Sequence, residues 1–126
     1  MKKRVAKPYG ELVDGLMAEK SRVLSQAQAF DDMGLEETAR PLWSCAASYE
    51  ERIAPLLDVL SRDAEAALHR VSAAACLEKC REWSRAANLY RAALAGPLSV
   101  AAKADVEREL STCLKRLHQA AFDSVA

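Results

Sequence analysis

The sequence predicts an all-α protein with a single domain over residues 1–126, and three observations support that fold class. The chain has 25 alanines against 4 glycines and 4 prolines, a composition that favours helix throughout. Apolar residues recur at helical spacing in several long stretches. A pattern of small and aromatic residues also occurs twice, at a constant offset of 47 residues. We therefore expect two stacked antiparallel helical hairpins followed by a C-terminal capping helix.

The repeated pattern places small residues on both sides of one aromatic residue. The first copy contains Ala27, Phe30, Gly34, Ala39, Trp43 and Ala46, and the second contains Ala74, Leu77, Arg81, Ala86, Tyr90 and Ala93. Small residues let two antiparallel helices approach closely, and the aromatic ring fills the gap beside them. A buried Trp43 then needs a hydrogen-bond partner for its indole nitrogen.

The first hairpin has the clearest boundaries. Residues 1–8 are expected to form a basic, flexible N-terminus, and the first helix begins near Pro8 and ends near Met33. Gly34 can adopt the left-handed conformation that ends a helix, and Glu36 and Glu37 suit the first turn of the next one. Inward residues of the first helix are expected to be Leu12, Leu16, Val23, Ala27 and Phe30. The second helix keeps one apolar phase from Ala39 to Leu60, so Pro55 is expected to kink it without interrupting it.

The second hairpin allows two interpretations. Side chains of Ser61, Arg62 and Asp63 can cap a third helix over about residues 62–80, with Leu68, Val71, Ala74 and Leu77 inward. Arg81 stands where the first copy has Gly34, and a left-handed arginine costs roughly 1 kcal/mol more than a glycine. The alternative is one long helix over residues 62–95. The sequence does not decide between them.

The last helix follows Gly96-Pro97, and Ser99 can cap it. Its apolar stripe is expected to be buried and consists of Val106, Leu110, Cys113, Leu114, Leu117 and Ala121. The tail of residues 123–126 is expected to fray.

Charge and cysteine content limit the partners and the compartment. Eighteen basic residues balance eighteen acidic residues, so we expect no nucleic-acid partner. The sequence has neither an export signal nor a long apolar run, which predicts a cytoplasmic protein with no membrane partner. Four cysteines within apolar helical stretches are expected to remain thiols, and most of them to be small core residues.

The sequence also predicts no enzymatic activity, no cofactor and no metal site. Neither histidine belongs to a recognisable nucleophile and base set. His69 and Cys76 are roughly 10 Å apart along a helix, too far for one zinc ion to join them and Cys80. Neighbouring carboxylates such as Glu50 and Glu51 are interpreted as solvated helix faces.

Residues of about 20–97 resemble the small-large-small signature of tetratricopeptide repeats. The resemblance rests on Gly34-x4-Ala39-x3-Trp43-x2-Ala46 and on Ala86-x3-Tyr90-x2-Ala93. The offset of 47 exceeds the 34 residues usual for that family, so the second helix is expected to be extended or followed by an insertion.

The resemblance implies a protein-binding adaptor that holds a partner's segment against the first helix of each hairpin. The residues expected to contact the partner are Leu24, Gln28 and Asp31 in the first copy, Val71, Ala75 and Glu78 in the second, and Trp83 at the second turn. The lysine and asparagine clamp that some of these proteins use for a terminal carboxylate is absent at the matching positions. An apolar or amphipathic helix is therefore the expected occupant.

Two alternatives remain open at the level of sequence. Leu24 and Val71 can be core residues covered by the chain's own last helix, which leaves no groove. The protein can also be a self-associating helical bundle, an accessory subunit that forms a homodimer through its apolar faces.

Overall fold

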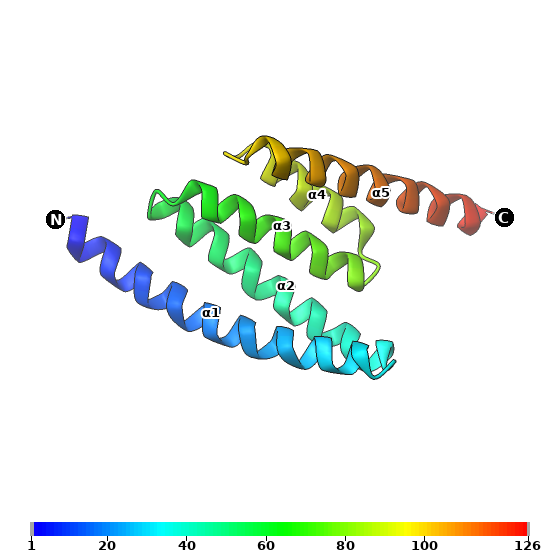
Figure 1. Ribbon diagram of the computed structural model, residues 1–126, viewed down its shortest axis with the longest axis horizontal. Helices are drawn as coiled ribbons and strands as arrows, with labels where there is room; N and C mark the ends of the chain where they lie inside the picture. Colours follow the sequence, from blue (N-terminus) through cyan, green and yellow to red (C-terminus); the bar gives the residue numbers. More distant parts are fainter. Residues whose placement is uncertain (1, 126) are drawn as a thin grey trace.

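The computed structural model describes the backbone of residues 2–125 and the side chains of residues 7–125, and it contains five α-helices. The helices are α1 (Lys2–Asp32), α2 (Glu36–Val59), α3 (Asp63–Lys79), α4 (Trp83–Leu94) and α5 (Val100–Val125). Each helix runs antiparallel to the one before it, and the five lie side by side in chain order (Figure 1). Each one packs against its neighbour in sequence, from α1 on α2 to α4 on α5. The all-α fold class is confirmed, and residues 62–95 form two helices instead of one.

Two helix ends differ from the expected boundaries. α1 begins at Lys2 and so includes Pro8, whose ring removes only one hydrogen bond near the start of the helix. α5 continues to Val125, so it contains most of the segment that was expected to fray. α2 passes through both Pro41 and Pro55, as the unbroken apolar phase predicted.

One turn geometry joins the first four helices at three successive places. Gly34, Ser61 and Arg81 all have positive φ, at 77°, 59° and 60°. At each turn the amide of the next residue donates to the carbonyl oxygen five residues back, over 2.9 Å from Leu35 to Phe30, 2.8 Å from Arg62 to Leu57 and 2.9 Å from Glu82 to Leu77. These are the bonds of a Schellman motif, which satisfies the last carbonyls of a helix. The glycine turn is as expected, and Arg81 adopts the same geometry.

The middle turn shows that the repeated pattern occurs three times. Ser61 lies 27 residues after Gly34 and 20 residues before Arg81, so the offset of 47 spans two equivalent turns. Alanines five and twelve residues after each positive-φ residue are fully buried; they are Ala39 and Ala46, Ala66 and Ala73, and Ala86 and Ala93. The expected side-chain caps at Ser61 and Asp63 are wrong, because the residue preceding α3 is Arg62 and makes no side-chain cap bond.

A polar contact across each turn accompanies the small residues. The residue nine positions after the turn donates to the carboxylate three positions before it. Trp43 Nε1 donates to Asp31 Oδ2 over 2.9 Å, Arg70 to Asp58 over 2.5 Å, and the Tyr90 hydroxyl to Glu78 over 2.5 Å. The first of these is the partner predicted for the Trp43 indole. Because both groups of each pair come from adjacent helices, the contacts fix the register of the three successive helix pairs, α1–α2, α2–α3 and α3–α4.

The core consists of two clusters of buried side chains. The larger one contains Trp43, Leu77 and Tyr90 with many alanines, and the smaller one contains Val13, Ile53 and Leu57 near the other end of α2. Several residues expected to be buried are exposed: Leu12, Leu68, Leu114, Leu117 and Ala121. All of these except Leu68 lie on α1 and α5, the outermost helices, which have a neighbour on one side only, so part of each apolar stripe stays uncovered. Leu68 lies on a face of α3 that neither α2 nor α4 covers.

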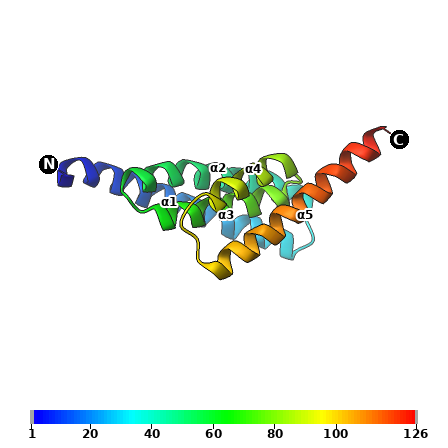
Figure 2. The same cartoon turned by 90° about the horizontal axis from the view of Figure 1, so that it is seen from above.

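The partly uncovered apolar stripe is clearest on α5, the last helix. Val106 and Cys113 are buried against α4, and Ser99 caps α5 by accepting a bond from the Ala102 amide, as predicted. Beyond them the C-terminal half of α5 extends away from the other helices (Figure 2). α5 therefore covers α4 without closing the array.

The left-handed residues of the middle and last turns give a first testable prediction. Ser61→Gly and Arg81→Gly should each raise the free energy of unfolding by about 0.5–1 kcal/mol, since glycine adopts positive φ without a Cβ clash. Urea unfolding followed by circular dichroism measures the change. Ser72→Gly, at an exposed position inside α3, is the matched control and should instead lower stability by about 0.5 kcal/mol. A loss of similar size at Ser61 would contradict the strain assigned to the turn.

Candidate functional site

Two adjoining hollows lie on the face of the molecule to which α1, α3 and α5 contribute. The α1–α3 hollow has a volume of about 440 Å³ and is lined by Gln28, Asp31, Asp32, Glu36, Arg40, Glu78, Lys79, Arg81 and Trp83. The α3–α5 hollow has a volume of about 490 Å³ and is lined by Val71, Ala75, Glu78, Lys79, Trp83, Tyr90, Glu109, Thr112 and Arg116. Glu78, Lys79 and Trp83 line both, so the two hollows form one continuous surface across α1, α3 and α5.

Six of the seven residues expected to contact a partner line these hollows. Gln28 and Asp31 belong to the α1–α3 hollow, Val71 and Ala75 to the α3–α5 hollow, and Glu78 and Trp83 to both. Leu24 does not line either one. It is half-buried and packs against the larger core cluster. The spacing of 47 residues thus brings the two sets of predicted residues onto one face of the molecule.

The last helix bounds this face instead of filling it. Val71 is half-buried at the edge of the larger cluster, while Glu109 and Thr112 of α5 form the opposite wall of the hollow. The sequence left open whether α5 covers Leu24 and Val71. Both residues contribute to the core, and the hollow beside Val71 remains open.

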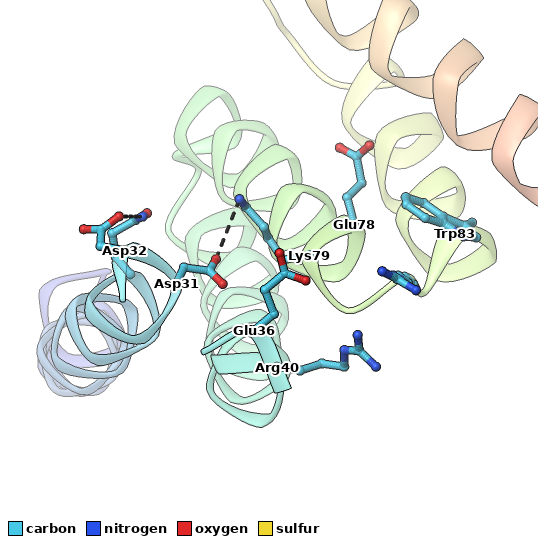
Figure 3. Close-up of a pocket in the computed structure, with 9 residues that line it drawn as sticks. Asp31, Asp32, Glu36, Arg40, Glu78, Lys79 and Trp83 are labelled. Atoms are coloured by element: carbon cyan, nitrogen blue, oxygen red, sulfur yellow. Dashed lines mark hydrogen bonds and ion pairs between the residues drawn. The ribbon is translucent and has the colours of Figure 1, made fainter. Parts of the chain in front are cut away.

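The α1–α3 hollow carries charges of both signs. Lys79 Nζ lies 3.8 Å from Asp31 Oδ2 and also 5.6 Å from the centre of the Trp43 ring, and Figure 3 shows the lysine and the aspartate pointing toward each other. The Asp32 carboxylate accepts a bond from Gln28 over 2.9 Å. The ion pair joins α1 to α3, whereas the bond between Gln28 and Asp32 lies within α1. Together they leave a polar wall on the side of α1.

Trp83 is the aromatic residue common to both hollows. It is the first residue of α4, is half-buried against the larger cluster, and has the Arg116 guanidinium 5.9 Å from its ring centre. The cation–π contact joins the start of α4 to α5. The sequence left open whether Trp83 anchors a partner or covers the end of the core, and its position permits both.

Glu78 is the centre of a polar group between α3, α4 and α5. Its carboxylate accepts the Tyr90 hydroxyl, and burial together with this bond raises the pKa of Tyr90. Burial, followed by repulsion from Glu78 and a hydrogen bond with it, also raises the pKa of Glu109. Glu109 was not predicted as a site residue, because its relation to Glu78 depends on how α5 packs.

Glu50 was interpreted as part of a solvated face, and that interpretation is wrong. Its side chain is 1% exposed and lies between the two core clusters. Glu50 Oε1 is 3.4 Å from Lys20 Nζ and 2.9 Å from His69 Nδ1, while Oε2 is buried without a hydrogen-bond partner. A carboxylate from α2 thus meets a cation from α1 and an imidazole from α3. Sequence spacing within α2 alone cannot reveal such a contact.

Three of the four cysteines have a thiol that is harder to ionise than usual. Burial, reinforced by nearby carboxylates, raises the pKa of both Cys76 and Cys113 to about 12, and burial raises the pKa of Cys80. These thiols stay protonated at neutral pH. Cys76 and Cys113 are buried, Cys80 is half-buried and Cys45 is exposed, so two of the four cysteines occupy the core position expected for most of them. Within residues 2–125, no group of three or more histidine, cysteine and acidic side chains could hold a metal ion.

Comparisons with known proteins add no family. No family model matches the chain, and neither curated proteins nor solved structures give a significant match. None of the described helices has the length and apolar character needed to span a bilayer.

Proposed function

We propose that this protein is a small interaction adaptor that holds a helix or peptide of a partner protein along the face formed by α1, α3 and α5. The observation that carries the proposal is the continuity of the two hollows around Glu78, Lys79 and Trp83. A helix laid in a groove makes its contacts through side chains three and four residues apart, and a surface crossing several helices offers successive positions for them. The proposal includes no catalytic step.

A tetratricopeptide-like arrangement is part of the same proposal. Two features support it: small-large-small packing at Trp43 and Tyr90, and antiparallel hairpins that follow one another in chain order. In such an array the first helix of each hairpin lines one face. α1 and α3 are the first helices of the two hairpins here, and α5 follows them in the same alternation.

Selection of binders from a phage-displayed peptide library on the full chain tests the proposal. The selected peptides should shift the NMR signals of Gln28, Ala75 and Trp83. Ala75→Glu should weaken their binding at least tenfold, since it adds a long charged side chain at an exposed position in the hollow. Ala64→Glu, exposed near the start of the same helix, is the matched control and should leave binding unchanged. Equal binding by the two variants, or a selection without specific binders, would overturn the proposal.

A self-associating bundle is the second candidate, because of one observation. Leu114, Leu117 and Ala121 form an exposed apolar stripe on the extended half of α5. Such a stripe can pair with the same stripe of a second copy. Size-exclusion chromatography with light scattering separates the candidates: the adaptor should remain a monomer, and the bundle should dimerise and return to a monomer on Leu117→Glu.

A further inference from the structure

The α3–α5 hollow combines an apolar floor with a pair of like charges. Val71 and Ala75 of α3 and the indole of Trp83 provide the floor. Glu78 of α3 and Glu109 of α5 line the same hollow, and so do the basic residues Lys79 and Arg116. A floor of this kind accepts an apolar side chain, while the two carboxylates determine which charge can accompany it.

The two carboxylates are unfavourable neighbours when both are ionised. Glu78 is half-buried and already accepts the Tyr90 hydroxyl, so it cannot move away without losing that bond. Repulsion from Glu78 is one of the causes that raise the pKa of Glu109. The fold therefore holds two carboxyl groups together, and a cation between them would favour the form in which both are ionised.

The basic side chains nearby have other contacts. Lys79 is directed toward Asp31 and the Trp43 ring, Arg116 lies over Trp83, and Arg108 is bonded to Asp105. Glu109 retains a raised pKa with these cations in place. A further positive charge has a favourable position between Glu78 and Glu109.

We propose, on the basis of the adaptor function, that the segment held in the α3–α5 hollow is an amphipathic helix with a lysine or arginine between Glu78 and Glu109. An apolar or aromatic side chain of the same helix packs on Val71 and Trp83. The charge pair thus selects basic segments, and the apolar floor supplies contact area.

Three synthetic peptides test this inference. All have the same apolar pattern over about 15 residues, enough for a marginal helix in water, and carry lysine, glutamine or glutamate at the flanking positions. Fluorescence anisotropy with the full chain should rank their affinities in the order lysine, glutamine, glutamate. Binding of the lysine peptide should also weaken as salt is added, because screening reduces the attraction.

Substitution of one carboxylate tests whether the preference for the lysine peptide arises at Glu109. Glu109→Gln should reduce the affinity for the lysine peptide about fivefold, as expected for one ion pair, and leave the glutamine peptide unaffected. Glu107→Gln, an exposed glutamate on the same helix, removes the same charge and is the matched control. Glu109→Gln should not lower stability: with its pKa raised in the folded state, ionised Glu109 weakens the fold at neutral pH, and glutamine relieves that repulsion.

The outcomes separate this inference from the adaptor proposal. If the glutamine or glutamate peptide binds as tightly as the lysine peptide, or if Glu107→Gln weakens binding as much as Glu109→Gln, the preference for a basic segment is wrong. If none of the three peptides binds, it is wrong as well. In each case the adaptor function stands or falls separately, with the unbiased selection and its Ala75 and Ala64 variants.

Discussion

Trp43→Ala should lower the free energy of unfolding by about 3–5 kcal/mol. The ring is only 7% exposed and belongs to the larger core cluster, so its removal leaves a cavity that the surrounding side chains fill only in part. The substitution also removes the donor of the bond to Asp31. Urea unfolding monitored by circular dichroism measures the loss.

Trp83→Ala is the control for this prediction. Trp83 is half-buried at the edge of the same cluster, so its loss should cost clearly less than the loss of Trp43. The Trp83 variant should instead weaken binding of a selected peptide, because Trp83 lines both hollows and Trp43 lines neither. Near-wild-type stability of the Trp43 variant would contradict the core described here.

Lys20→Met should lower the free energy of unfolding by about 3 kcal/mol, because it leaves a buried carboxylate without its cation. Glu50 is almost fully buried, and its Oε2 already has no donor. His69 remains 2.9 Å from Oε1 and supplies the only polar contact described for that carboxylate after the change. Methionine replaces the lysine stem with a side chain of similar length, so the loss reports on charge more than on packing.

A triple variant separates the effect of the buried charge from the effect of packing. Lys20→Met, Glu50→Leu and His69→Leu together replace the whole group with apolar side chains, and such replacements are often neutral or stabilising. The triple variant should therefore unfold at a urea concentration close to wild type, well above that of Lys20→Met. If the triple variant is as unstable as the single one, the cost comes from packing and the charge argument is wrong.

The sequence predicts the turns and helix ends better than it predicts which side chains are buried. Gly34, the acidic start of α2 and the Ser99 cap are decided within one or two helical turns, and all three are as expected. A helix boundary near Ser61 was expected, but its positive φ and its place in the repeat were missed, because serine has no particular preference for positive φ and because Arg70 occupies the place of the aromatic residue. The matching alanines at positions 66 and 73 were the available signal.

Burial depends on neighbours that a single helix does not specify. Leu12 and Leu117 lie on apolar stripes, yet both are exposed because α1 and α5 are the outer helices of the array. Glu50 lies at a charged position and is buried because α1 and α3 supply its partners. Glu78 and Glu109 differ for the same reason. The repeated pattern was enough to predict Glu78 as a site residue, whereas predicting Glu109 requires knowing how α5 packs.

Packing between successive helices also affects how the molecule opens. Most of its contacts join segments close in sequence, an arrangement that favours fast folding and lets unfolding begin at an end. Amide protons in α2, α3 and α4, which have a neighbour on each side, should exchange with deuterium most slowly, and those in the last turns of α5 most rapidly. Partial opening from the C-terminus would then remove one wall of the α3–α5 hollow while α1, α2 and α3 stay folded.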